Sequence, residues 1–194
     1  MHVDVLTGAA LDAVLDDVAQ LRLDVFRAWP YLYDGDRGYE RAYLQRYRDS
    51  ADAVVVGAFD GDRLVGAATG APLLDHAEDF VGAFEDSGED LTRIFYCAES
   101  VLLPEYRGQG IGHRFFDLRE AHARDTGHLK SAFCSVLRPE DHPDRPTDYL
   151  PLDGFWRRRG YHPLAGVIAR FAWKDTGNSD ETLKPLQFWI RRLD

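Results

Sequence analysis

Apolar residues recur along the chain with two different spacings, which distinguish the predicted strands from the predicted helices. Runs that alternate with polar residues, or are wholly apolar, predict strands at residues 2–6, twice within 53–73, and at 93–104, 129–137, 167–174 and 183–193. Residues at helical spacing predict helices within 11–25, 39–50 and 111–122. The acidic segment 75–90 is expected to be helical, and residues 153–160 are expected to form a short helix. This order predicts a mixed α/β domain in which parallel strands flank the helix at 109–126.

Turn and cap signals mark several of these boundaries. Asp60 and Gly61 join the two runs within 53–73 and are typical of a tight β-hairpin. Thr7 is a candidate cap for the first helix, and Gly160 is expected to end the last one. The run at 93–104 is apolar on both faces, as expected of a central strand that helices cover on both sides.

Composition predicts one globular domain over residues 1–194. Hydrophobic residues make up 45% and charged residues 29% of the chain, which is typical of a soluble folded protein. The formal net charge of −10 argues against nucleic-acid binding, because phosphate contacts need a basic face. No apolar run approaches the ~20 residues of a membrane span, and the first residues lack a signal-peptide pattern. Since two cysteines form no disulfide framework, we expect a cytoplasmic protein. The lack of a long apolar run leads us to expect no membrane partner.

A glycine-rich stretch, Arg107-Gly-Gln-Gly-Ile-Gly112, lies between a predicted strand and a predicted helix. Such a turn aims unpaired N–H groups and the positive end of the helix dipole at one point, which favours an anion. A P-loop would end in Gly-Lys-Ser/Thr, whereas His113 follows Gly112 here. A dinucleotide fingerprint needs G-x-G-x-x-G, but the spacing here is G-x-G-x-G.

The stretch matches a third pattern, Arg/Gln-x-x-Gly-x-Gly/Ala, at every fixed position. It thereby resembles the acetyl-CoA pyrophosphate loop of the GNAT superfamily of N-acetyltransferases. The order of elements, the Asp-Gly hairpin and "FWRRRGY" before the penultimate strand are similar to that fold over nearly the whole chain. The segments "FRAWPYLYDGD" and "YERAYLQRY" further resemble a bacterial branch of the superfamily. The resemblance implies a mixed, mostly antiparallel central sheet with helices on both faces, in a single domain.

The resemblance also implies acetyl-CoA as cosubstrate, and no metal. Backbone groups of the strand before the glycines would bond the pantetheine arm, and one N–H would polarise the thioester carbonyl. Loop amides, with help from Arg107, would hold the pyrophosphate. The cofactor-binding residues implied in this way are Val101, Leu102, Leu103, Arg107, Gly108, Gln109, Gly110, Ile111, Gly112 and His113.

The implied reaction is direct transfer of an acetyl group to a primary amine, which has to lose a proton. Glu99 is the candidate base, because a carboxylate in an apolar strand can have a raised pKa. The alternative is a structural carboxylate that is hydrogen-bonded to neighbouring backbone. Many family members protonate the departing thiolate with a tyrosine where this chain has Trp156, so Tyr149 is the substitute candidate. Cys134 would offer a covalent route, although a cysteine in an apolar strand usually has an unreactive thiol.

The acceptor groove of the family is lined by the connection between the first two helices. In this chain Tyr31, Tyr33 and Asp34 bring aromatic and acidic groups that suit an ammonium ion. The expected acceptor is a small-molecule or peptide amine, and transfer of a longer acyl group stays open. The alternative function is a non-catalytic acyl-CoA-binding or regulatory module with the same fold. Family members often form homodimers through their last strands, and the apolar residues 185–193 are compatible with one.

Overall fold

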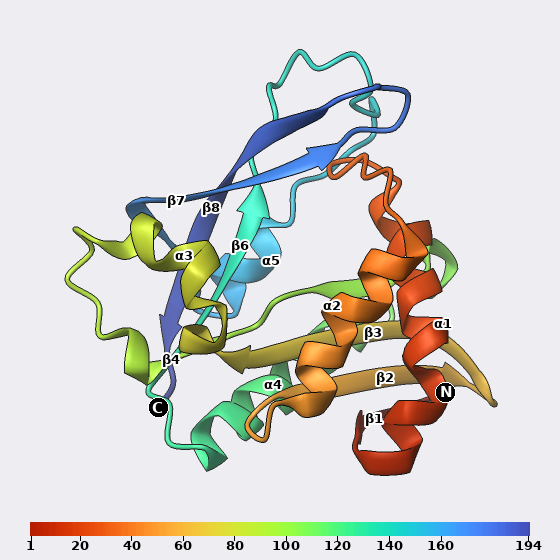
Figure 1. Ribbon diagram of the computed structural model, residues 1–194, viewed down its shortest axis with the longest axis vertical. Helices are drawn as coiled ribbons and strands as arrows, with labels where there is room; N and C mark the ends of the chain where they lie inside the picture. The colour runs from red at the N-terminus through yellow and green to blue at the C-terminus, as the bar shows by residue number, and fades with distance from the viewer.

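The computed structural model describes residues 1–194, apart from the side chains of residues 77, 79 and 81. The chain begins with β1 (His2–Leu6), α1 (Gly8–Phe26), α2 (Arg37–Asp49), β2 (Val54–Asp60) and β3 (Arg63–Pro72). It continues with α3 (Ala77–Phe84), β4 (Ile94–Tyr96) and β5 (Ser100–Leu102). The last elements are α4 (Ile111–Asp125), β6 (Lys130–Val136), α5 (Asp153–Arg158), β7 (His162–Lys174) and β8 (Glu181–Arg192), as Figure 1 shows.

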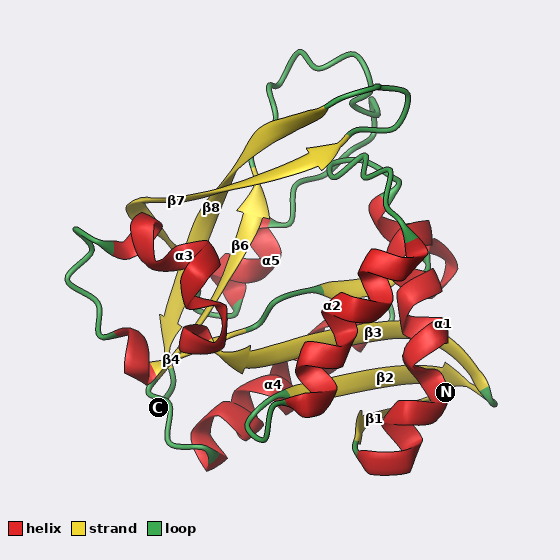
Figure 2. Cartoon of the chain, viewed as in Figure 1, coloured by secondary structure: helices red, strands yellow, loops and turns green.

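The strands form one sheet in the order β1-β2-β3-β4-β6-β8-β7, and β5 pairs with β3 beside β4. Among the described pairings, β4 with β6 is parallel and the others are antiparallel. Helices α1, α2 and α3 lie on one face of the sheet and α4 and α5 on the other (Figures 1 and 2). The predicted mixed, mostly antiparallel sheet with helices on both faces is therefore confirmed.

Large apolar side chains fill the space between the sheet and the helices on both faces. Burying each of them contributes about 1.5–3 kcal/mol relative to exposure. Beneath α4 the buried side chains include Phe95, Phe115, Phe116, Phe133 and Tyr161. On the opposite face they include Val18, Leu21 and Leu44 beside α1 and α2, and Phe80, Phe84 and Phe188 beside α3. These two layers fix the positions of the strand ends at which the candidate site lies.

The prediction of one continuous central strand at 93–104 is wrong, because the chain is irregular between β4 and β5. Residues 97–99 lie outside both strands. The guanidinium of Arg119, which is 1% exposed, holds this break by donating to Thr69 O at 3.0 Å, Glu99 O at 2.9 Å and Ser100 Oγ at 2.8 Å. A buried arginine that bonds the carbonyls of Thr69 on β3 and Glu99 in the break keeps the backbone groups there paired. β3 thus pairs with both β4 and β5 across the break, whereas β6 pairs with β4 and, among the described pairings, not with β5.

The predicted turn signals have mixed outcomes. Gly61, at φ +59°, forms the hairpin turn, and Gly160, at φ +86°, follows α5, so both predictions are confirmed. Thr7 occupies the N-cap position of α1 as expected, although its hydroxyl accepts no hydrogen bond from an N–H group of that helix.

The last strand lies inside the sheet. β8 pairs with β6 on one edge and with β7 on the other, and Phe188, Trp189 and Ile190 are buried. The large apolar side chains of residues 185–193 are therefore buried within this chain rather than exposed, and a homodimer stays a prediction. The edge strand at this end is β7.

Candidate functional site

The sheet opens between β5 and β6. β4 pairs with β6 only over Ile94, Phe95 and Tyr96, and the last contact between them is the bond from Cys97 N to Ala132 O at 2.8 Å. Beyond this point β5 pairs with β3 and β6 with β8, and no described pairing joins β5 to residues 133–136. Two strand edges with free hydrogen-bonding groups therefore face each other across a gap.

The pairing register decides which backbone groups face this gap. Leu103 N donates to Val65 O at 3.0 Å and Thr69 N donates to Glu99 O at 3.1 Å, so odd-numbered residues of β5 bond to β3. Because bonding directions alternate along an antiparallel pair, Leu102 directs its N–H and C=O the other way. Of the three predicted pantetheine residues, Leu102 thus faces the gap, whereas Val101 and Leu103 face β3.

The glycine loop (residues 107–113) places unused donors at one end of the gap. Gly108 has φ +75° and Gly110 has φ +83°, and neither has another atom within 4 Å of a built Cβ. Glycine is required there by the backbone conformation rather than by crowding. The first bond within α4 runs from Arg114 N to Gly110 O at 3.2 Å, and no described backbone bond uses the N–H groups of residues 108–113. This donor set fits a phosphate.

The side chains of the loop lie at its rim. Arg107 Nε donates to Leu102 O at 3.3 Å, across the mouth of the gap. Gln109 Nε2 donates to Glu105 O at 3.2 Å, and Ile111, the first residue of α4, is buried. His113 stacks edge-on against Phe155, with ring centroids 4.8 Å apart. The arrangement therefore leaves Arg107 as the cation closest to the gap among the loop residues.

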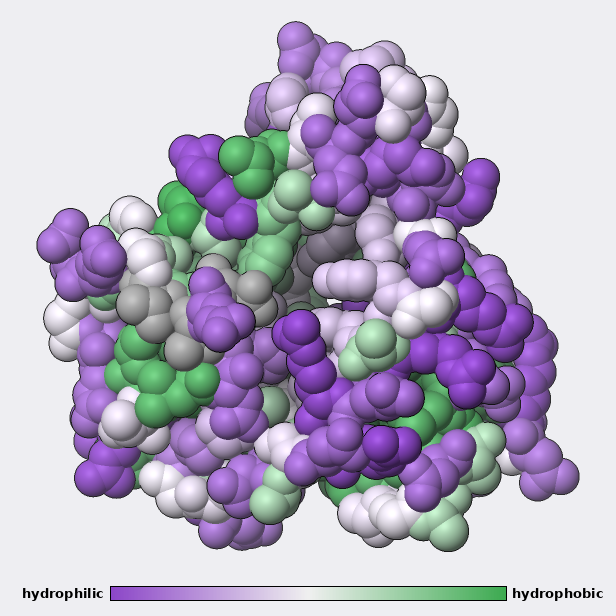
Figure 3. Space-filling model, in the orientation of Figure 1, coloured by the Kyte–Doolittle hydropathy of each residue, from purple (hydrophilic) through white to green (hydrophobic). Residues whose placement is uncertain are grey.

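A single cavity of about 1930 Å³ joins the glycine loop to Glu99 and to the loop of residues 27–36. Figure 3 shows this face of the molecule hollowed near its centre, between the side formed by α1 and α2 and the side formed by β7. Among the predicted residues, the following line the cavity: Tyr31, Tyr33, Asp34, Glu99, Leu102, Arg107, Gly108, Gly110, Gly112, His113 and Tyr149. The structure thus brings together residues that are more than a hundred positions apart in sequence.

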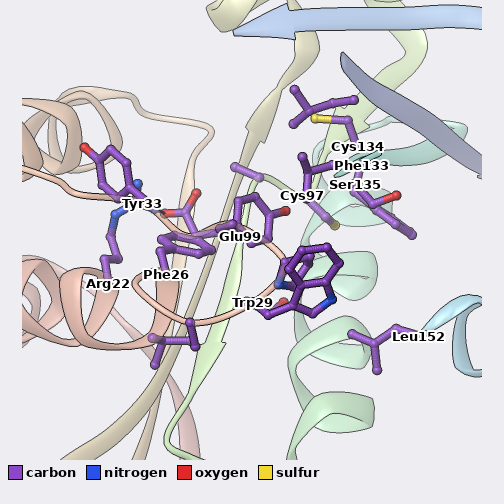
Figure 4. Close-up of a pocket in the computed structure, with 18 of the residues that line it drawn as sticks. Arg22, Phe26, Trp29, Tyr33, Cys97, Glu99, Phe133, Cys134, Ser135 and Leu152 are labelled. Carbon is purple, nitrogen blue, oxygen red and sulfur yellow. Dashed lines mark ion pairs between the residues drawn. The ribbon is translucent and has the colours of Figure 1, made fainter. Parts of the chain in front are cut away.

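Glu99 is held by side chains, in a polar setting that the sequence did not reveal. One carboxylate oxygen forms an ion pair with Arg22 of α1, and the other accepts a hydrogen bond from Tyr43 of α2 at 2.9 Å. Figure 4 shows Arg22 beside Glu99. Arg22 also pairs with the fully buried Glu40, so one guanidinium serves two carboxylates. Burial alone would lower the pKa of Arg22, but the charges of Glu99, Tyr43 and Glu40 outweigh it and raise the pKa.

A chain of polar side chains extends this network to His76, which also lines the cavity. Tyr43 Oη lies 2.8 Å from Tyr47 Oη, which lies 3.3 Å from His76 Nε2. Burial, followed by the charge of Glu99, raises the pKa of both tyrosines, so they remain protonated near neutrality. Because buried ion pairs are costly to desolvate, the Glu99–Arg22–Glu40 triad is not explained by stability alone.

Tyr149, Trp156 and Cys134 lie around the gap with different chemistry. Burial, followed by the charge of Asp153, raises the pKa of Tyr149, which therefore keeps its phenolic proton. Trp156 packs against Phe133 at 4.9 Å and Trp189 at 5.1 Å. Burial raises the pKa of Cys134 to about 12, so its thiol is protonated at neutral pH and is a poor nucleophile. The covalent route therefore has no support in the geometry.

The three predicted acceptor residues lie in the 27–36 loop, which is anchored to β7. Tyr31 packs against Phe26 at 4.7 Å between ring centroids. Burial, followed by the charge of Glu40, raises the pKa of Tyr33. Asp34 Oδ2 pairs with Lys174 Nζ at 2.7 Å, and this hydrogen bond lowers the pKa of Asp34. Asp34 is therefore an ion-paired carboxylate rather than a free one.

Arg138 fixes the 27–36 loop over the end of the cavity. Its guanidinium bonds both carboxylate oxygens of Asp175 at 2.8 Å and donates to Pro30 O at 2.9 Å and to Tyr31 O at 2.7 Å. Burial alone would raise the pKa of Asp175, but Arg138 and Lys184 outweigh it and lower the pKa. Such a bidentate pair is strongly directional, so it defines where the loop lies.

Arg22, Arg119 and Arg138 are the residues of this site that the sequence analysis missed. Two of them had a detectable signal. Arg119 lies four residues after Phe115, on the apolar stripe of α4, and Arg22 lies four residues after Val18, on the apolar stripe of α1. A charged residue on a buried stripe needs partners. Arg138 has partners far away in sequence, so no local pattern reveals it.

No three histidine, cysteine, aspartate or glutamate side chains among those described come together as metal ligands. In the part of the chain that the structure describes, no helix has the length and apolar character to cross a bilayer.

Comparison with known proteins places this geometry in context. Residues 15–146, more than half of the chain, match the model of the acetyltransferase (GNAT) family. A search of curated proteins finds none that matches. An aminoglycoside 6'-N-acetyltransferase in complex with coenzyme A is 16% identical, with a TM-score of 0.61, and the match covers 100% of this chain and 98% of that chain.

Two further solved structures share the fold. The ribosomal-protein-alanine N-acetyltransferase from Brucella melitensis is 15% identical, with a TM-score of 0.63, over 100% of both chains. The protein yncA from Salmonella typhimurium, solved with its cofactor acetyl-CoA, is 12% identical, with a TM-score of 0.61, over 100% of this chain and 95% of that chain. At these identities the likeness shows the fold alone.

Proposed function

Because the chain belongs to the acetyltransferase (GNAT) family, we propose that it transfers an acetyl group from acetyl-CoA to a primary amine by direct attack. The observation that carries this proposal is the cavity that joins the glycine loop to Glu99. One end offers backbone donors that suit a phosphate, and the other offers a carboxylate that suits an ammonium ion. The acceptor is a small-molecule or peptide amine.

The residues at the loop end fit acetyl-CoA. The N–H groups of residues 108–113 hold the pyrophosphate, and Arg107 adds a charge-assisted contact. Leu102 directs its N–H and C=O toward the gap, where they bond the pantetheine amides. When bound, acetyl-CoA supplies the activated acetyl thioester. No metal takes part in this proposal.

The residues at the other end handle the amine and its protons. Glu99 accepts a hydrogen bond from the ammonium group and takes its proton, while Arg22 and Tyr43 keep the carboxylate in place. Tyr149 lines the cavity and keeps its phenolic proton, so it is the acid that we assign to the departing thiolate. Tyr31 and Tyr33 contribute walls of the cavity around the amine.

The alternative function is a module that binds acyl-CoA without turnover. Trp156 favours it, because an indole N–H is not a usable acid at the position where many relatives have a tyrosine. The two functions differ in one measurable result, which is release of the CoA thiol in the presence of an amine.

The test is thiol release from acetyl-CoA across a panel of primary amines, with the Glu99→Gln variant beside the wild type. We expect Glu99→Gln to lower kcat by roughly 10²- to 10⁴-fold, with the affinity for acetyl-CoA unchanged. Glu120→Gln is the matched control, because Glu120 is also a buried ion-paired carboxylate but lies outside the residues that line the cavity. It should lose stability and keep its turnover.

The outcomes separate the hypotheses. Wild-type turnover in Glu99→Gln would remove Glu99 as the base. Binding of acetyl-CoA without thiol release from any amine would favour the non-catalytic module.

A further inference from the structure

Trp29 carries a polar group that the protein itself does not satisfy. Its indole N–H is buried, and no described residue accepts a hydrogen bond from it. Leaving a buried donor unpaired costs about 1–3 kcal/mol. Each such group in a native structure therefore calls for an explanation.

Two other indoles of the cavity wall, those of Trp173 and Trp189, make a contrast with Trp29. Trp173 Nε1 donates to Tyr31 O at 3.0 Å, and Trp189 Nε1 donates to Ser135 Oγ at 3.2 Å. Both residues line the same cavity as Trp29. Tyr31 O accepts bonds from both Arg138 and Trp173, and Pro30 O accepts one from Arg138. Of the three indoles of Trp29, Trp173 and Trp189, only that of Trp29 has no acceptor among the described residues.

The indole ring is braced on the acceptor side of the cavity. It belongs to the 27–36 loop and lies against His142, at 5.0 Å between ring centroids, and Tyr149, at 5.9 Å. Figure 4 shows its side chain extending into the space between Glu99 and the wall that carries Ser135 and Leu152. Two segments from distant parts of the sequence therefore hold this donor in a fixed direction.

We propose that Trp29 recognises the acceptor by donating its indole N–H to an oxygen of the amine substrate. An indole N–H is a donor only, so its partner has to be a hydroxyl, carbonyl or carboxylate oxygen. The acceptor class is then a primary amine with an oxygen on its carbon skeleton, such as an amino sugar, an amino alcohol or an amino-acid amide. This inference rests on the proposed acetyl transfer and names its substrate class.

The first test observes the indole N–H directly. The chain has four tryptophans, so protein labelled with ¹⁵N-tryptophan should give four indole signals, and Trp29→Phe and Trp173→Phe identify two of them. CoA is added first, and then glucosamine, ethanolamine or alaninamide, each beside an oxygen-free counterpart, cyclohexylamine or propylamine. CoA without an acetyl group allows a ternary complex without turnover.

We expect the Trp29 signal to move downfield and to exchange more slowly with water when at least one oxygen-bearing amine is added. Its oxygen-free counterpart should not change the chemical shift of the Trp29 signal. The chemical shift of the Trp173 signal should stay unchanged in every titration. A Trp29 response to CoA or acetyl-CoA alone would assign the partner to the cosubstrate and overturn the inference. Absence of any Trp29 response would overturn it as well.

The second test uses turnover. Trp29→Phe keeps an aromatic ring but removes the donor, so it should lower kcat/KM for the responding amine roughly 3- to 10-fold more than for its oxygen-free counterpart. Equal losses for both amines would contradict the inference. Thiol release without a Trp29 response would overturn the inference about Trp29 and leave the proposed acetyl transfer intact. If CoA changes no indole signal, both the proposed acetyl transfer and the inference about Trp29 would be contradicted.

Discussion

The two ends of the cavity are built in different ways. At the glycine loop the functional groups are backbone N–H donors, supplied by six consecutive residues and oriented by two left-handed glycines. At the Glu99 end they are side chains from α1, α2 and the break between β4 and β5. One end is a local feature of the sequence, and the other is assembled by the whole fold.

This difference predicts different sensitivities to mutation. A backbone site depends on a conformation, so only substitutions that change the conformation of the loop should impair it. A side-chain site depends on charges that are buried together, so loss of one partner leaves the others uncompensated. The predictions below probe each end with a matched control elsewhere in the chain.

The largest effect is expected at the buried triad. Arg22→Met removes the cation between Glu40 and Glu99, and we expect the free energy of unfolding to fall by about 3–5 kcal/mol. Arg41→Met is the control, because Arg41 pairs with Asp16 at 2.9 Å on the surface and should cost at most about 1 kcal/mol. Denaturant titration measures both. Similar small losses of unfolding free energy in both variants would show that Glu40, Arg22 and Glu99 are not a coupled unit. Adding Glu40→Gln to Arg22→Met should restore part of the lost stability, because it removes one of the two unpaired carboxylates.

A smaller effect is expected at the anchor of the 27–36 loop. Asp175→Asn breaks the bidentate contact with Arg138, and we expect a loss of about 2 kcal/mol at pH 7. The pKa of Asp175 is lowered in the folded state, so its stabilisation is present above its unfolded pKa of about 3.9 and is lost as the pH falls through the folded value. The difference between wild type and variant should therefore narrow below about pH 4.

The functional consequence of Asp175→Asn sharpens the comparison between the two ends. Because the anchor touches only the loop at the acceptor end, KM for the amine should rise while the affinity for CoA stays unchanged. Asp117→Asn, at an exposed partner of Arg159, should change neither quantity. Equal losses of CoA affinity and amine affinity would contradict the separation of the two ends.

The sequence carried most of the information about the fold and the glycine loop. The hairpin at Asp60 and Gly61, the helices and the parallel pair around α4 follow from periodicity and turn residues that act over a few positions. The glycine loop is likewise local, because the conformations of Gly108 and Gly110 and the start of α4 lie within one short segment. Local patterns were therefore sufficient for this end.

The acceptor end could not be predicted in the same way. The setting of Glu99 depends on Arg22, 77 positions earlier, and on Tyr43, 56 positions earlier. The predicted continuous strand at 93–104 failed because Arg119 holds the break from the other side of the sheet. Likewise Asp34 looked like a free carboxylate until the fold placed Lys174 beside it. In each case the decisive partner comes from a distant element.

The most direct test of the account is titration calorimetry of CoA with the wild type, Gly110→Ala and Gly127→Ala. Gly110 lies at the start of α4 with φ +83°, and Gly127 follows the same helix with φ +82°; neither has a neighbouring atom within 4 Å of a built Cβ. Both variants should lose roughly 1–2 kcal/mol of stability through the strained backbone. We predict that CoA affinity falls at least tenfold in Gly110→Ala and stays within about twofold of the wild type in Gly127→Ala. Unchanged affinity in Gly110→Ala, or no CoA binding by the wild type, would contradict the assignment of the glycine loop to the cosubstrate.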